Sequence, residues 1–267
     1  MTTPCQTTDL KVYLINLDRA TERLARMTYR LNAVPLAFER VPAVDGRSLT
    51  FPTPDFSELS FKLLHGRRRI PSEVGCYLSH VECARRLLAT DARYALILED
   101  DVAFSDDFAE VLEAAVACSA SWDILRLSEL NTGPKLPYAP LIGQRNLAVA
   151  LLREKGAGAY VINRRAAEWF VKRLVPMRLS WDIAFDLEYL SGLRASFVYP
   201  VPADQRTETV SQIQNDVRSA KLPRWRYLSV LPYRAYLEST RVVMRLYRLI
   251  RLRVSETWIV AGADKKD

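Results

Sequence analysis

The sequence predicts an α/β protein in which a mainly parallel sheet is flanked by helices and followed by a basic helical extension. Short apolar runs alternate along the chain with helical patterns of ten or more residues, the order that builds such sheets. At 267 residues, the chain is long enough for one large domain and a modest appendage. Its 49% hydrophobic and 26% charged residues exclude a disordered or fibrous protein.

Hydrophobic periodicity places the expected elements along the chain. Loops are expected at 50–70 and 129–146, which contain prolines and polar residues. Ser72 and Asn163 are expected to cap two of the helices, because short polar side chains accept hydrogen bonds from free backbone N–H groups. The expected strands are 11–17, 38–41, 94–98, 124–127, 147–152, 159–162 and 196–201. The expected helices are 20–31, 72–89, 107–118, 163–174 and 183–190.

Positive charge is concentrated near the C-terminus. Residues 221–253 carry nine Lys or Arg and one acid, a net charge of +8, whereas the whole chain carries +7. The rest is therefore close to neutral, which argues against a nucleic-acid-binding protein. We divide the chain into a main α/β domain at 1–220 and a basic amphipathic extension at 221–267.

The extension contains a helical pattern at 239–254 with two stripes, one of arginines and one of apolar residues. Such a helix suits the headgroup layer of an anionic membrane, so residues 224–254 are expected to contact that surface. A chain ending at Pro223 is then expected to fold and to lose membrane binding. The alternative is a helix packed on the domain with its arginines in solvent.

Membrane spans, secretion signals and zinc motifs are not predicted. No stretch approaches the roughly 20 apolar residues of a span, and the start of the chain lacks the pattern of a signal peptide, so we expect a cytoplasmic location. The four cysteines (Cys5, Cys76, Cys83 and Cys118) have no zinc-site spacing and are expected to be reduced and mostly buried.

Three consecutive acids, Glu99, Asp100 and Asp101, directly follow an apolar strand. Like charges this close repel one another, and a hard divalent cation with oxygen ligands relieves the repulsion. In extended backbone, Glu99 and Asp101 would face one side and Asp100 the other. The alternative is an acidic loop that caps the next helix. The segment 16–19 also falls at the carboxyl end of a strand, where open α/β sheets bind ligands.

Several short motifs together resemble glycosyltransferase family 25, which includes bacterial lipooligosaccharide galactosyltransferases and collagen galactosyltransferases. The resemblance covers roughly residues 11–215. Its motifs occur in the same order as in the family: Asn16-Leu17-Asp18-Arg19 with Arg23, Ala43-Val44-Asp45-Gly46, Gly75-Cys76-Tyr77-Leu78-Ser79-His80, Leu98-Glu99-Asp100-Asp101-Val102 and Gly158-Ala159-Tyr160.

The resemblance implies a glycosyltransferase-A-like fold, a UDP-sugar donor, Mn²⁺ or Mg²⁺, and inversion at the anomeric carbon. Glu99 and Asp101 are the metal candidates. The alternatives are a solvated helix face for the arginines, an ordinary turn for Asp45 and a structural hydrogen bond for His80. The donor-contact candidates are Asn16, Asp18, Arg19, Arg23, Asp45, His80 and Asp100.

Inverting transfer requires a base that takes the proton of the acceptor hydroxyl. Asp182 matches the later acidic position of the family, and Trp181 beside it is a candidate wall for stacking a sugar. A donor-sugar contact or a helix N-cap are the alternatives for Asp182. Glu129, Asp186 and Glu188 are further acids in the region. Gln205 and Ser211 loosely resemble a late family pattern.

The predicted function is transfer of a hexose, galactose from UDP-galactose, to a lipooligosaccharide or lipopolysaccharide acceptor. The enzyme would then act on the cytoplasmic face of the bacterial inner membrane. The alternative is a catalytically inactive nucleotide-sugar-binding or scaffold protein of the same fold.

Overall fold

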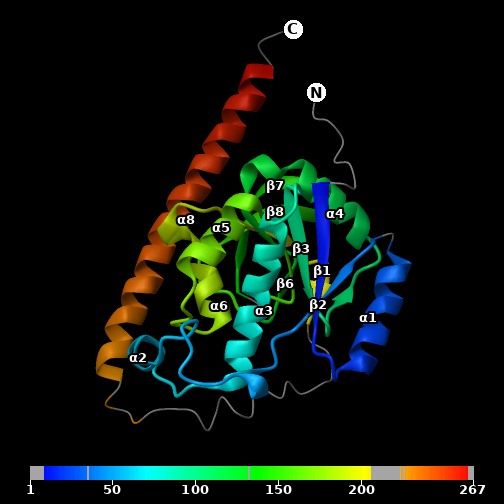
Figure 1. Cartoon of the computed structure of the whole chain (residues 1–267). Helices are drawn as coiled ribbons and strands as arrows, with labels where there is room; N and C mark the ends of the chain where they lie inside the picture. Colours follow the sequence, from blue (N-terminus) through cyan, green and yellow to red (C-terminus); the bar gives the residue numbers. More distant parts are fainter. Residues whose placement is uncertain are drawn as a thin grey trace.

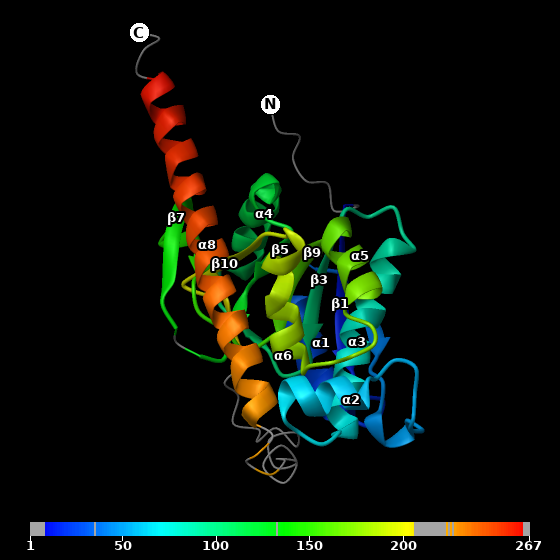
Figure 2. The same ribbon diagram turned by 90° about the vertical axis from the view of Figure 1, so that its left-hand side faces the viewer.

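The computed structural model describes residues 9–34, 36–131, 133–205 and 227–263, together with Pro223 and Trp225, and side chains of the last helix as far as Val254. A large sheet lies at the centre with helices on both faces, and the long C-terminal helix runs along the molecule (Figure 1). Figure 2 shows this helix beside β7 and β10. The α/β class, the flanking helices and the C-terminal helix are confirmed.

The strands of the main sheet are β1 Leu10–Asn16, β2 Glu39–Pro42, β3 Tyr94–Glu99, β5 Ile124–Arg126, β7 Lys135–Ile142, β8 Arg145–Ala150, β9 Ala159–Asn163 and β10 Ala195–Tyr199. A small sheet contains β4 Ala103–Phe104, β6 Ser128–Glu129 and β11 Ala203–Asp204. The α-helices are α1 Thr21–Ala33, α2 Glu58–Ser60, α3 Pro71–Leu88, α4 Phe108–Ala117, α5 Arg164–Arg173, α6 Trp181–Ala184 and α8 Tyr227–Ala263. Shorter helical turns are η2 Gly46–Ser48, η3 Phe61–His65, η4 Ser119–Ser121 and η5 Phe185–Ser191.

The main sheet is mixed, with strand order β2-β1-β3-β9-β5-β10-β8-β7. β1 pairs in parallel with both β2 and β3, and β10 pairs in parallel with β5. β9 lies antiparallel between β3 and β5, and β8 is antiparallel to both β10 and β7. The expected parallel arrangement thus holds for the first three strands, whose carboxyl ends meet at one edge.

Two hydrophobic cores cover the two faces of the sheet. Because side chains alternate along a strand, Tyr13 and Ile15 of β1 enter the core under α3, α5 and α6, while Val12 and Leu14 enter the core under α1 and α4. Asn163 accepts a hydrogen bond from the backbone of Ala166 and caps α5, as predicted.

Two expected loops contain regular structure instead. The region 129–146 forms the hairpin of β7 and β8, whose register shifts near Pro137 and Pro140. Those prolines weaken the alternating pattern, and proline is tolerated on an edge strand because it needs no ladder donor. Residues 50–70 contain α2 and η3. Ser72 is not an N-cap, because α3 already begins at Pro71 and Ile70 occupies the cap position.

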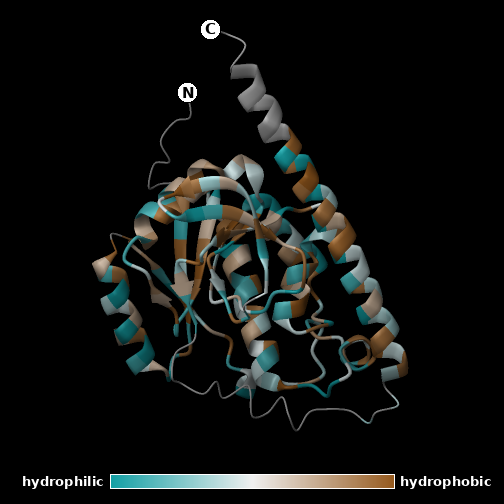
Figure 3. Ribbon diagram, turned by 180° about the vertical axis from the view of Figure 1, so that it is seen from behind, coloured by the Kyte–Doolittle hydropathy of each residue, from teal (hydrophilic) through white to brown (hydrophobic). Residues whose placement is uncertain are grey.

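Helix α8 packs on the domain with some of its arginines facing inward. Arg241 and Arg245 are buried, whereas the apolar residues Val243, Tyr247 and Ile250 are exposed. The expectation of an outward arginine stripe is therefore wrong for Arg241 and Arg245, whereas Arg251 and Arg253 are exposed. In Figure 3, brown hydrophobic segments recur along this helix. Within the described residues, no helix has the length and apolar character needed to cross a membrane.

The cysteines in the described part of the chain are free. Cys83 is buried and Cys76 half-buried, but Cys118 is exposed, which corrects the expectation for that thiol. Cys5 lies outside the described residues.

Candidate functional site

A cavity of about 390 Å³ lies at the carboxyl ends of β1 and β3. The strand register places Ile15 opposite Glu99, so the two segments singled out in the sequence meet at this edge. The cavity is lined by all of the predicted donor and metal residues except Asp18: Asn16, Arg19, Arg23, Asp45, His80, Glu99, Asp100 and Asp101. Asp18 points away, with 81% of its side chain exposed, and pairs with Arg40 at 2.5 Å.

Asp100 is held by two partners from the first βα unit. Nδ2 of Asn16 donates to Oδ2 of Asp100 at 2.7 Å, and the Arg23 guanidinium lies 3.1 Å from Oδ1. Arg40, which the sequence analysis missed, donates to Oδ1 of Asn16 at 3.1 Å and fixes its amide. Asp100 is therefore already neutralised by protein groups, which suits a positioning contact to the donor better than a metal ligand.

Glu99 is held by residues from two distant segments. Nε2 of His80 lies 3.0 Å from Oε1, and Gln205 donates to Oε2 at 2.6 Å. The other ring nitrogen of His80 contacts the Tyr160 hydroxyl at 2.9 Å. Gly158 leaves room for Gln205, because a Cβ there would overlap the glutamine side chain. Glu99 retains free lone pairs, since a carboxylate accepts about four hydrogen bonds.

Asp101 is the least satisfied of the three acids. Its Oδ1 is buried and has no hydrogen-bond partner among the described residues. Burial, followed by the charges of Glu99 and Asp100, raises the pKa of Asp101 to about 7. An orphaned carboxylate oxygen beside a second carboxylate fits a hard divalent cation, which would supply the missing positive charge.

The backbone geometry of the acidic triplet differs from the sequence expectation. Glu99 ends β3, and Asp100 and Asp101 form a turn, so the alternation of an extended strand does not apply. All three side chains therefore line the same cavity.

A second group of possible ligands escaped the sequence analysis. One ligand atom each from Cys76, His80 and Glu99 lie within 4.8 Å of one another. Cys76 and His80 are four residues apart on α3 and so share a helix face, a spacing that could have revealed the pair. Burial raises the pKa of the Cys76 thiol far above its ordinary value, so this side chain stays protonated and is a poor ligand for Mg²⁺ or Mn²⁺.

Asp45 and Arg19 face each other at the mouth of the cavity and form an ion pair. Asp45 also accepts a hydrogen bond from the backbone of Arg47 at 3.0 Å, and this bond and Arg19 lower the pKa of Asp45. The turn is fixed on α3 by close packing, because a Cβ on Gly46 would overlap the Pro71 carbonyl and one on Gly75 would overlap the Val44 carbonyl.

Asp182 is not among the residues that line this cavity. It lies in the first turn of α6, directly after Trp181, whose ring stacks on the lining residue His80. Burial and the charge of Glu99 raise the pKa of Asp182, while Arg126 and His80 oppose that shift. The backbone of Gly156 also opposes the shift. The N-cap alternative is wrong, because Ser180 occupies the cap position.

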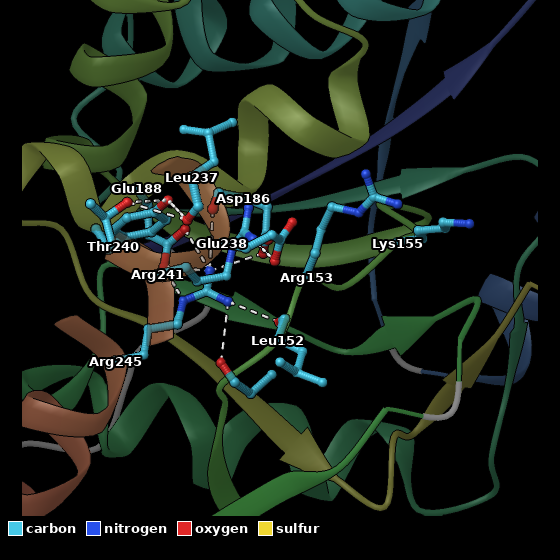
Figure 4. Close-up of polar contacts among 12 residues, drawn as sticks. Leu152, Arg153, Lys155, Asp186, Glu188, Leu237, Glu238, Thr240, Arg241 and Arg245 are labelled. Atoms are coloured by element: carbon cyan, nitrogen blue, oxygen red, sulfur yellow. Dashed lines mark hydrogen bonds and ion pairs between the residues drawn. The ribbon is translucent and has the colours of Figure 1, made fainter. Parts of the chain in front are cut away.

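The other acids and the aromatic wall suggested for this region are not available to substrate. Trp181 is 4% exposed and packs between His80 and Phe185, so it cannot stack on a sugar. Asp186 and Glu188 are buried in ion pairs with Arg245 (Figure 4). Glu129 is buried and paired with Lys135. Ser211 lies outside the described residues.

The cavity lies at the carboxyl ends of parallel strands, which is where open α/β sheets bind their ligands. Residues 9–136 match the sequence profile of glycosyltransferase family 25, described as an LPS biosynthesis protein. This segment is similar to that family, and the resemblance carried by the motifs is confirmed.

Two curated relatives illustrate the match. Procollagen galactosyltransferase 1-A of Xenopus laevis is 29% identical over 203 residues, covering 70% of this chain and 33% of that protein. Probable inactive glycosyltransferase 25 family member 3 of Rattus norvegicus is 31% identical over 136 residues, covering 47% of this chain and 23% of that protein. The chain spans about a third of the first relative and a smaller share of the second.

One solved structure is also similar. It is a glycosyltransferase involved in the glycosylation of the major capsid of PBCV-1, with a TM-score of 0.40 and 12% identity, covering 78% of this chain and 96% of its own.

Proposed function

We propose that this protein transfers galactose from UDP-galactose, with inversion at the anomeric carbon, to the oligosaccharide of a lipid-linked acceptor. The observation that carries the proposal is the cavity in which the acids 99–101 lie opposite Arg19 and Arg23, on a segment that is similar to family 25. The name of the Xenopus laevis relative, a procollagen galactosyltransferase, supports galactose as the transferred sugar.

Glu99 and Asp101 would hold the divalent cation, Mn²⁺ or Mg²⁺. When bound, the cation would neutralise the negative charge that grows on the departing diphosphate. Arg19 and Arg23 lie four residues apart, and both line the cavity. Their guanidiniums complement the same diphosphate, with Arg19 exchanging its contact to Asp45 for the donor. Asp45 presents oxygen acceptors for the uracil or ribose, and Asn16, which is 1% exposed, holds Asp100 in place.

Asp182 is proposed as the base that takes the proton of the acceptor hydroxyl. The side chain is half-buried, and Glu99 and burial raise its pKa, which favours proton uptake. The stacked ring of Trp181 fixes the adjacent backbone, so this carboxylate has a defined position relative to the cavity.

The acceptor is proposed to lie on an anionic membrane, which the outward face of α8 contacts. This face carries large apolar side chains along its length: Leu228, Leu231, Tyr236, Val243, Leu246, Tyr247, Ile250 and Val254. Arg251 and Arg253 are exposed near its end. The one acid between 227 and 254 is Glu238, whose side chain is 45% exposed and pairs with Arg241. An apolar stripe with tyrosines and basic residues, and with its single acid paired to an arginine, suits the lipid headgroup layer.

The sequence suggested that the arginine stripe of α8 contributes to membrane binding, but the structure points to a different source of binding free energy. Arg241 and Arg245 are engaged inside the protein, so insertion of apolar side chains contributes most, and exposed arginines add about 1 kcal/mol each near an anionic surface. The corresponding location is the cytoplasmic face of the bacterial inner membrane, where a lipooligosaccharide acceptor is assembled.

A catalytically inactive protein is the second candidate, because some relatives in this family are described as inactive. Both candidates require a donor cavity, and only turnover distinguishes them. The deciding experiment is a screen of UDP-sugars for UDP release, with and without Mn²⁺ and with lipooligosaccharide acceptor. Preferential, Mn²⁺-dependent consumption of UDP-galactose supports the transferase. Binding of UDP-galactose without turnover in any acceptor mixture supports the inactive protein.

A further inference from the structure

One face of α3 brings a thiol and an imidazole close to the carboxylate of Glu99. Cys76 and His80 are four residues apart on this helix, so their side chains lie one turn apart on the same face. Glu99 ends β3, and one ligand atom each from Cys76, His80 and Glu99 lie within 4.8 Å of one another. A sulfur, a nitrogen and an oxygen donor therefore meet at the cavity that all three residues line.

The separation of these three atoms suits a tetrahedral zinc ion. Bonds of about 2.0–2.3 Å to nitrogen, oxygen and sulfur place the ligand atoms roughly 3.3–3.8 Å apart. Nε2 of His80 lies 3.0 Å from Oε1 of Glu99, and Cys76 is within the 4.8 Å limit, so small side-chain adjustments bring all three atoms onto one ion. Because these residues line a cavity, a fourth position remains for water, as in zinc sites with three protein ligands.

The contacts around the cluster are those that support metal ligands. A histidine ligand usually engages a polar group through its other ring nitrogen, which fixes the ring. Nδ1 of His80 lies 2.9 Å from the Tyr160 hydroxyl, and the ring stacks on Trp181. Gln205 donates to Oε2 of Glu99 at 2.6 Å and so fixes the carboxylate. When the ring proton is on Nδ1 and donates to Tyr160, the lone pair of Nε2 is available to the ion.

The donor set selects a different ion from the one proposed to bind the diphosphate. Mg²⁺ and Mn²⁺ prefer oxygen ligands, whereas zinc binds thiolate sulfur and imidazole nitrogen well. As the zinc–sulfur bond forms, the S–H bond of Cys76 breaks and its proton passes to solvent. The thiolate and the Glu99 carboxylate then balance the two positive charges of the ion, so the half-buried site is neutral when zinc is bound.

We propose that Cys76, His80 and Glu99 form an inhibitory zinc site. Glu99 is also a proposed ligand of the catalytic Mn²⁺ or Mg²⁺, so zinc bound to this carboxylate competes with that ion. Loss of the catalytic ion weakens binding of the donor diphosphate. The inhibition rests on the proposed function, whereas the binding of zinc depends only on the three side chains.

Titration with Co²⁺ tests the site directly. Co²⁺ takes similar ligands to zinc, and its bond to a thiolate gives a charge-transfer absorption band that oxygen ligands do not give. The reduced full-length protein is titrated as wild type, Cys76→Ser and the control Cys118→Ser, whose thiol is free, exposed and outside the cluster. We expect the band in wild type and control, its absence in Cys76→Ser, and its removal by added Zn²⁺. In calorimetry, Cys76→Ser should weaken Zn²⁺ binding at least about tenfold, because even an outer partner of a ligand contributes about 10- to 100-fold.

Two results would overturn the zinc site. One is the absence of a thiolate band in wild type, and the other is the same band in Cys76→Ser. Circular dichroism verifies that each variant folds. If Cys76→Ser does not fold, Cys76→Ala gives the same test, because alanine introduces no hydroxyl and also lacks the ligand atom.

Competition is measured by calorimetry of UDP in Mn²⁺, with and without Zn²⁺. We expect Zn²⁺ to weaken UDP binding at least about tenfold in wild type and Cys118→Ser, and to change it less than about twofold in Cys76→Ser. An equal effect of Zn²⁺ in all three proteins, or none in wild type, rejects the inhibitory role. If Mn²⁺ alone does not tighten UDP binding in wild type, the proposed donor site fails and the inhibition fails with it. The cobalt band still decides the zinc site.

Discussion

The rings of His80 and Trp181 stack with their planes 2° apart and their centroids 4.7 Å apart. This contact joins α3, which lines the donor cavity, to α6, which carries the proposed base at the next residue, Asp182. His80 also contacts Glu99, so one buried ring relates the metal candidate to the base. The same packing contact therefore helps to position both the proposed metal ligand and the proposed base.

Replacing the proposed base should separate chemistry from donor binding. Asp182→Asn keeps the shape of the side chain and removes its basicity, so we expect kcat to fall roughly 10²–10⁴-fold. The affinity for UDP-galactose, measured by calorimetry, should change little. Equal losses of affinity and kcat would favour a donor-sugar contact, and normal kcat would reject the base.

His65 should make the fold sensitive to acid. The ring is 3% exposed, and neither nitrogen has a hydrogen-bond partner among the described residues. Burial and the charges of Arg67, Arg234 and Arg153 lower its pKa from 6.5 to about 3. Below pH 6.5 the unfolded chain takes up a proton that the folded chain refuses, so stability falls between pH 6.5 and about 3.

Each pH unit in that window costs about 1.4 kcal/mol from this group, or about 2 kcal/mol between pH 6.5 and 5. Urea unfolding at both pH values measures the loss. His65→Leu has a similar volume and cannot titrate, so its stability should change less over the same range. An identical decrease in wild type and variant would reject His65 as the acid-sensitive group.

The outward face of α8 should bind anionic vesicles. Tyr247→Ser combined with Ile250→Ser removes exposed apolar surface and should strongly reduce co-sedimentation with liposomes that contain phosphatidylglycerol. Ser239→Ala, also exposed on α8, is the control and should sediment like wild type. Point variants are preferable to a chain ending at Pro223, because truncation would leave Asp186 and Glu188 buried without Arg241 and Arg245.

Two outcomes would contradict the membrane proposal. One is that neither wild type nor variant sediments, and the other is that both sediment equally. In the first case, a wild-type dimer that dissociates in the double variant, measured by analytical ultracentrifugation, would assign the apolar face to a second copy of the chain.

Strands with continuous apolar runs were predictable because burial on both faces removes polar residues from them. β1 and β3 therefore fall close to their expected bounds, and the cap at Asn163 was readable from its side-chain chemistry. The hairpin of β7 and β8 was not readable, since its prolines interrupt the alternation. The antiparallel direction of β9 depends on tertiary packing, which local periodicity does not contain.

The candidate site was predictable as a location because the carboxyl ends of β1 and β3 meet at one sheet edge. Its individual contacts were not. Arg40 reaches Asn16 from β2, and Gln205 reaches Glu99 across 106 residues of chain. The orientation of α8 also depends on contacts that are distant in sequence. Its periodicity shows that the helix has two faces but not which face packs on the domain. The acids that pair with Arg245 lie 57 and 59 residues earlier in the chain.

The central claim is that a divalent cation held by Asp101 and Glu99 binds the diphosphate of the donor. Calorimetric titration of UDP, with and without Mn²⁺, tests it in wild type, Asp101→Asn and the exposed control Asp106→Asn. We expect Mn²⁺ to tighten UDP binding at least about tenfold in wild type and control, a difference of about 1.4 kcal/mol. Asp101→Asn should fold normally and lose that gain, with Glu99→Gln weakening it in the same direction. Unchanged UDP affinity of Asp101→Asn in Mn²⁺ would contradict the account.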